Sequence, residues 1–91
     1  MKPILHIVKN TNDMQAIDII KRQAMDNAYG VTVVFIHNIE SLPSISNARI
    51  CVLREAIIDK TTSFNNTPEA ELIDYTDMLN MVFSVESVTV W

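Results

Sequence analysis

The chain has 91 residues, of which 48% are hydrophobic and 20% charged, with a single Cys and a single Gly. This length predicts one domain over residues 1–91, and the composition excludes wholesale disorder, an intramolecular disulfide and a cysteine-rich zinc centre. All seven Lys and Arg residues lie in residues 1–60, whereas residues 61–91 carry five acidic residues and no basic one. We therefore expect no direct nucleic-acid binding, because no basic cluster exceeds Lys21–Arg22. We also expect no membrane span and a cytoplasmic location, because the chain has no long apolar run and no signal peptide.

The first third of the chain predicts a strand–helix–strand unit. Residues 4–8 form a continuous apolar run, which is typical of a strand covered on both faces. Polar residues 11–13 are N-cap candidates for a helix with an apolar stripe at Ala16, Ile17, Ile20 and Ala24. Gly30 is predicted to end this helix in a left-handed conformation. Residues 31–36 are the strongest predicted strand, because they are β-branched or aromatic throughout.

The rest of the chain predicts three further strands and one further helix. Strands are expected at 49–53, 71–73 and 87–91, a helix at 76–83, an irregular crossover at 37–47, a helical or mixed piece at 54–60 and a polar loop at 61–68. Alternating strands and helices favour a small three-layer α/β fold, with a mainly parallel sheet of about five strands and helices on both faces.

Four polar pairs follow the predicted strands, and the carboxyl ends of parallel strands share one edge of a sheet. We predict that these pairs form a rim for a partner or a ligand: Lys9, Asn10, His37, Asn38, Arg54, Glu55, Asp74 and Tyr75. The alternative interpretation is that they are only helix caps and turn residues.

Cys51 is the only thiol and therefore the only candidate cysteine nucleophile. A nucleophilic Cys needs an accessible thiolate, but Cys51 lies inside the apolar run 50–53, where a free Cys is usually a small buried side chain. We therefore expect no catalytic residue, with Cys51 as the alternative. His6 is expected to be a hydrogen-bonded core residue and His37 a turn residue, and no metal site or cofactor is predicted.

Trp91 follows Val90 in the last predicted strand, where Val88 and Val90 share one face and Trp91 lies on the other with Thr89. Two interpretations remain open for Trp91. Either this strand completes the sheet of its own chain, or Trp91 lies at a contact with another subunit, where Trp is enriched.

Both ends of the chain resemble the DsrH/TusB family. Residues 4–8, Ile-Leu-His-Ile-Val, are similar to its opening strand with a Leu-His motif. Residues 71–75, Glu-Leu-Ile-Asp-Tyr, followed by Met78–Leu79 and by Val90–Trp91, resemble its closing pattern. Residues 49–55 are similar to its third strand. The chain differs in its short segment between the second and third strands, and in His37–Asn38, where members tend to have an acidic-Gly pair.

The resemblance implies a DsrEFH-like fold and a small cytoplasmic subunit of a sulfur-relay complex. Such a subunit would act as an oligomeric scaffold beside DsrE- or DsrF-like (TusD- or TusC-like) partners, one of which carries the sulfur on a Cys. The pathway would be tRNA wobble-uridine 2-thiolation or sulfur oxidation. Three alternatives remain: self-association, a stand-alone sulfurtransferase using Cys51, and a homo-oligomeric small-molecule-binding module.

Overall fold

The computed structural model describes residues 2–10, 13–36, 45–54 and 70–91. These residues form five strands and two helices: β1 (Lys2–Val8), α1 (Met14–Ala24), β2 (Tyr29–Phe35), β3 (Ala48–Leu53), β4 (Ala70–Ile73), α2 (Tyr75–Ser84) and β5 (Ser87–Val90). The predicted order of elements is confirmed wherever the structure describes it. The expectations for residues 37–44 and 55–68 lie outside the described residues. Neither helix is long and apolar enough to cross a membrane.

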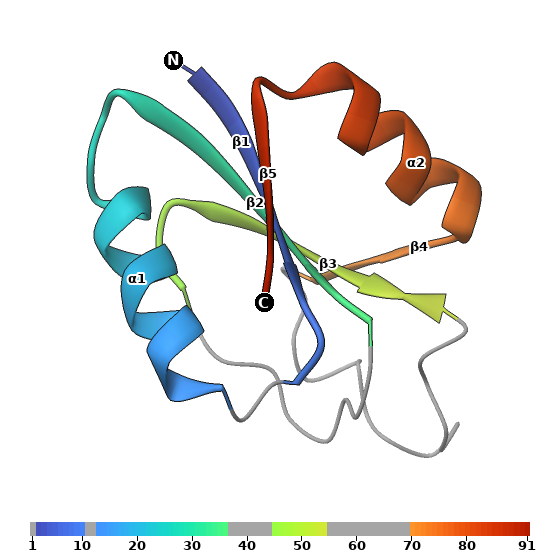
Figure 1. The fold of residues 1–91 in the computed structure, drawn as a ribbon, viewed down its shortest axis with the longest axis horizontal. Helices are drawn as coiled ribbons and strands as arrows, with labels where there is room; N and C mark the ends of the chain where they lie inside the picture. Colours follow the sequence, from blue (N-terminus) through green and yellow to red (C-terminus); the bar gives the residue numbers. More distant parts are fainter. Residues whose placement is uncertain (1, 11–12, 37–44, 55–69) are drawn as a thin grey trace.

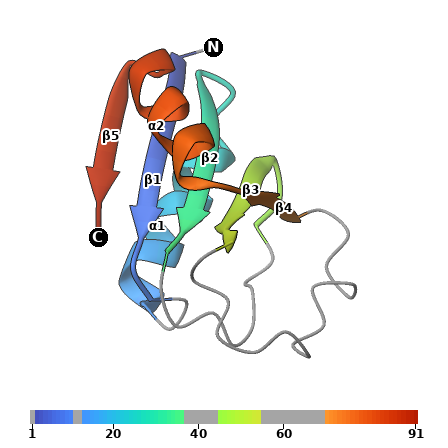
Figure 2. The ribbon, with the colours of Figure 1, turned by 90° about the vertical axis from the view of Figure 1, so that its right-hand side faces the viewer.

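The five strands form one sheet in the order β4-β3-β2-β1-β5, and every neighbouring pair is parallel. β2 is the central strand, and β1 beside it pairs with β2 over its whole length, from Lys2 opposite Tyr29 to Val8 opposite Phe35. Figure 2 shows β5, β1 and β2 side by side with their arrowheads at one end. The predicted α/β fold with a parallel sheet of about five strands is therefore confirmed.

Apolar side chains cover both faces of the sheet, as the unbroken apolar strands predict. On one face Ile4 and Val8 of β1 pack in a core with Ile17 and Ile20 of α1. On the other face the alternate β1 residue Leu5 packs in a second core with Met78 of α2. Because successive strand residues point to opposite faces, α1 and α2 lie on opposite sides of the sheet, as Figure 1 shows.

Helix α1 begins at Asp13, whose carboxylate accepts the backbone N–H of Ala16 at 3.1 Å. The prediction that Gly30 ends this helix is wrong. The helix ends at Ala24, and Asp26 begins a turn in which its carboxylate accepts the backbone N–H of Ala28. Gly30 lies within β2 without a positive φ. Among the described residues the left-handed position is instead Asn47, with φ 63°, just before β3.

Helix α2 begins with a capping box. The Asp74 carboxylate accepts the backbone N–H of Asp77 at 2.7 Å, and the Asp77 carboxylate accepts the backbone N–H of Asp74 at 3.3 Å. These bonds satisfy two backbone donors at the start of the helix. They also fix the direction in which the chain leaves β4 and crosses the sheet toward β5.

Candidate functional site

Cys51 lies in the middle of β3 and its side chain is completely buried. It belongs to the core on the α2 side of the sheet, together with Leu5, Ile7 and Val34. The neighbouring strand β4 places Glu71 opposite Cys51 in the register. The expectation that Cys51 is a buried side chain inside the sheet is therefore confirmed.

An ion pair lies beside the thiol. Arg49 is two residues before Cys51 on β3, and its Nε donates a hydrogen bond to Oε2 of Glu71. The same Glu71 oxygen lies 3.6 Å from Sγ of Cys51 and can accept its weak S–H hydrogen bond. No local pattern predicts this pair, because 21 residues separate Arg49 from Glu71 in the chain and nothing local indicates that β3 lies beside β4.

Burial raises the pKa of the Cys51 thiol to about 11. The positive charge of Arg49 acts to lower this pKa, but the Glu71 carboxylate acts against it. Arg49 in turn holds the pKa of Glu71 below its usual range by their hydrogen bond. With a pKa near 11, about one thiol in ten thousand is a thiolate at neutral pH, so this sulfur is a poor nucleophile.

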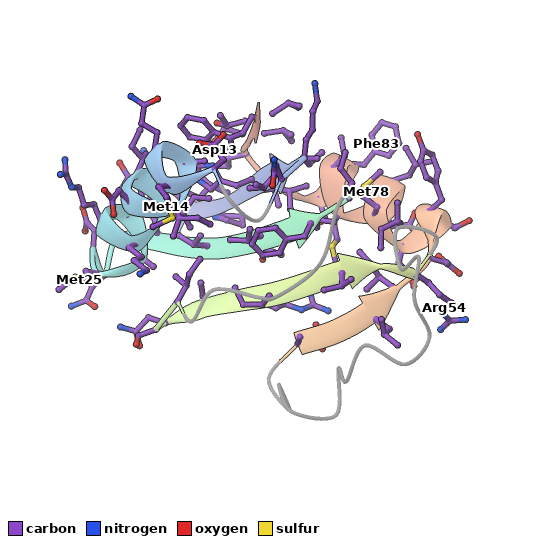
Figure 3. The ribbon with its side chains drawn as sticks, turned by 90° about the horizontal axis from the view of Figure 1, so that it is seen from below. Asp13, Met14, Met25, Arg54, Met78 and Phe83 are labelled. Carbon is purple, nitrogen blue, oxygen red and sulfur yellow. The ribbon has the colours of Figure 1, made fainter. Side chains whose placement is uncertain are left out.

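The predicted rim lies along one edge of the sheet, because all the strands are parallel and Phe35, Val52 and Val8 are in register. Lys9 and Asn10 follow β1, Arg54 follows β3, and Asp74 and Tyr75 follow β4; all five are exposed. Figure 3 shows Arg54 at the end of β3. His37, Asn38 and Glu55 lie outside the described residues.

The described rim residues do not form one compact cluster. β4 and β1 are three strands apart in the sheet, so Asp74 and Lys9 are separated by roughly 14 Å at the usual strand spacing. The Asp74 carboxylate accepts a backbone hydrogen bond of the α2 capping box, and the backbone oxygen of Asn10 accepts from Asp13 at the start of α1. Asp74 and Asn10 thus take part in helix starts, and Lys9, Arg54 and Tyr75 remain as exposed contact candidates.

A second buried group joins the two ends of the chain. His6 on β1 is 2% exposed, and its Nδ1 accepts the indole N–H of Trp91 at 3.0 Å. Because the indole nitrogen only donates, the proton of the neutral imidazole is on Nε2, which donates to Oε1 of Gln23 at 2.5 Å. Burial lowers the pKa of His6. His6 is thus a hydrogen-bonded core residue, as predicted, and Gln23 is the partner that the sequence analysis missed.

Trp91 packs against the core on the α1 side and its backbone N–H donates to Ile7 at the end of β1. Its ring is stacked near the His6 ring, with centroids 6.1 Å apart and planes inclined by 24°. The last strand therefore completes the sheet of its own chain. Trp91 lies on the opposite face from Val88 and Val90, as the alternation predicts, because those two are in register with Leu5 and Ile7.

No group of three or more His, Cys, Asp and Glu residues that could hold a metal ion occurs in the described part of the chain. Comparison with protein-family models, with curated proteins and with solved structures finds no significant match.

Proposed function

We propose that this chain is a non-catalytic cytoplasmic subunit of a sulfur-relay complex of the DsrE/F/H type, acting in tRNA wobble-uridine 2-thiolation or in sulfur oxidation. In this role it completes an oligomeric scaffold, and a DsrE- or DsrF-like partner subunit carries the sulfur on its own cysteine. The resemblance of both chain ends to the DsrH/TusB family supports the proposal.

The observation that carries the proposal is the burial of the only thiol. In persulfide transfer an acceptor thiolate attacks the terminal sulfur of a donor persulfide, forming a new S–S bond while the donor leaves as a thiolate. Cys51 offers neither access nor ionisation, since it is completely buried and its pKa is raised to about 11. This environment favours a scaffold role over a sulfur-carrying one.

The family-like residues at the two ends also have a structural role. The Leu-His motif supplies His6 and the terminal motif supplies Trp91, and these two residues bind each other. Asp74 of the Ile-Asp-Tyr motif starts α2. These motifs thus stabilise the fold, which is the property that a scaffold subunit has to provide.

Two experiments test the proposal. First, the tagged full chain is purified from the organism that encodes it, at low and at high salt. Recovery of a DsrE- or DsrF-like protein supports the proposal, and recovery of neither at any salt concentration contradicts it.

Second, the purified chain is incubated with a cysteine desulfurase and cysteine, with and without the recovered partner, and intact masses are measured. We expect the mass of one added sulfur atom on the partner and none on this chain. Addition to this chain that is lost in Cys51→Ser would instead identify it as a persulfide carrier.

A further inference from the structure

His6 links three segments of the chain on the α1 side of the sheet. It lies on β1, between β2 and β5, and it is the only buried polar side chain in the described part of the chain. Its Nδ1 accepts the indole N–H of Trp91 at 3.0 Å, and its Nε2–H donates to Oε1 of Gln23 at 2.5 Å. Both ring nitrogens are therefore engaged while the imidazole is neutral.

A second proton on this imidazole is incompatible with the bond to Trp91. Protonation turns Nδ1 into a donor, so its N–H would point at the indole N–H, which can only donate. The contact with Gln23 survives, because Nε2 already donates to it. Movement of Trp91 away from His6 removes the conflict between the two donors and lets water accept the new N–H.

No carboxylate contacts His6 among the described residues. The residues opposite His6 in the register, Val33 on β2 and Thr89 on β5, do not titrate. Lys2, the other charged residue of β1 on this face, is a cation. The sheet therefore provides no negative charge to balance a protonated His6.

Helix α1 provides no balancing charge either. Its charged residues are all exposed and lie outside the apolar stripe that packs on the sheet: Asp18, Lys21 and Arg22. Asp26, which follows the helix, is exposed, and its carboxylate accepts a backbone N–H of the next turn. Burial accordingly lowers the pKa of His6, and the hydrogen bond to Gln23 offsets only part of this effect. A charged His6 is thus accommodated better after Trp91 has moved than before.

β5 depends on Trp91 for its packing against a core. All four residues of β5 are exposed, whereas Trp91, which follows them, packs against the core on the α1 side. β5 lies at the edge of the sheet (Figure 2), and β1 is its only partner among the strands described. The backbone N–H groups that flank it donate to β1, from Glu86 to Pro3 and from Trp91 to Ile7. Loss of the Trp91 side-chain contact therefore leaves β5 held by backbone bonds at an exposed edge.

The rest of the sheet does not depend on β5. The buried members of both cores come from other parts of the chain, and Trp91 is only a partly buried neighbour of one core. Separation of β5 from β1 thus leaves both cores, and the two helices that pack on them, in place.

We propose that the His6–Trp91 contact is an acid-sensitive switch: protonation of His6 breaks its bond to Trp91 and releases β5 from β1, while the rest of the sheet stays folded. The carbonyls of Pro3 and Ile7 then lose their partners beside β5, and the freed edge of β1 is open to pair with another strand. The inference goes beyond the proposed function, because it holds whether or not a partner carries sulfur.

Amide hydrogen exchange of the full chain, followed residue by residue by NMR, tests the inference. Two amides report on the two sides of β1, since Trp91 donates to Ile7 and Ile36 donates to Val8. The opening constant at Trp91, corrected for the intrinsic exchange rate, should rise up to about tenfold for each pH unit below about 6.5. It should not change in low urea, whereas opening at Ile36 should be rarer and should increase with urea. Equal opening constants at Trp91 and Ile36, or no pH dependence at Trp91, overturn the inference.

Two variants separate titration of His6 from a general loosening of the edge. Gln23→Glu places a carboxylate opposite the Nε2–H of His6, which favours the charged imidazole inside the fold and brings its pKa closer to the ordinary value. The matched control Gln15→Glu adds the same charge at an exposed position of α1. The pH dependence of the opening constant at Trp91 should shrink in Gln23→Glu and stay unchanged in Gln15→Glu. An equal pH dependence in the two variants overturns the inference.

Discussion

Acidification should destabilise the protein through His6. The ordinary pKa of the imidazole is 6.5, and burial lowers it in the folded protein. Between the folded and the unfolded pKa, only the unfolded chain binds the proton. As the pH decreases through that window, the free energy of unfolding therefore falls by about 1.4 kcal/mol for each pH unit. Above a pH of about 6.5, the unfolded value, His6 is neutral in both states and its full contribution to stability is present. A proton on Nδ1 would also face the indole N–H of Trp91, which now donates to that atom.

The assay is urea unfolding of wild type and of His6→Asn from about pH 7.5 to about pH 5.5. The carboxylates titrate equally in both proteins, so the difference between their curves isolates His6. Trp91 is the only tryptophan, and its emission gives a local signal of His6 protonation. Parallel stability curves, or an emission change with a midpoint at or above pH 6.5, would refute the assignment of a neutral buried imidazole.

Three further predictions concern the thiol, the helix cap and the ion pair. Native Cys51 should react with a bulky maleimide far more slowly than after unfolding in urea, because it is buried with a pKa of about 11; equal rates would contradict its burial. Asp74→Ala should lower the free energy of unfolding by about 1 kcal/mol through loss of the capping box, whereas Asp74→Ser should lose less; equal losses would contradict a capping role. A double-mutant cycle of Arg49→Ala and Glu71→Ala should give a coupling energy below about 1 kcal/mol, because both side chains are about half exposed; a larger coupling would mean that the pair is far less hydrated than it is here.

The fold could be predicted from the sequence because its signals are local and repeated. Unbroken runs of β-branched and aromatic residues such as 31–36 indicated buried parallel strands, and the apolar stripe through Ile17 and Ile20 predicted the helix that covers one face. The burial of Cys51 followed from its apolar neighbours. The error at Gly30 has a physical reason, since a Gly can also occupy a strand, and the turn at 26–28 already ended the helix through the Asp26 side chain.

The contacts between distant segments could not be predicted in this way. The pairing of Arg49 with Glu71 depends on the register of β3 against β4, and the bond from Trp91 to His6 depends on β5 lying beside β1 rather than beside β4. Local patterns contain no information on strand order, which is set by how the crossovers pack.

Exposing the Cys51 thiol to a sulfur donor by opening the fold would carry a large free-energy cost. The thiol shares its core with Leu5, Ile7 and Met78, so separation of α2 from the sheet would expose these side chains together with the thiol. Each of these large side chains contributes about 1.5–3 kcal/mol by its burial, and opening would also expose Val34. The sum is several kcal/mol, comparable with the whole stability of a small domain, about 5–15 kcal/mol. Separating α2 from the sheet to expose the sulfur would thus remove much of the stability of the fold, which supports the proposal that a partner subunit carries the sulfur.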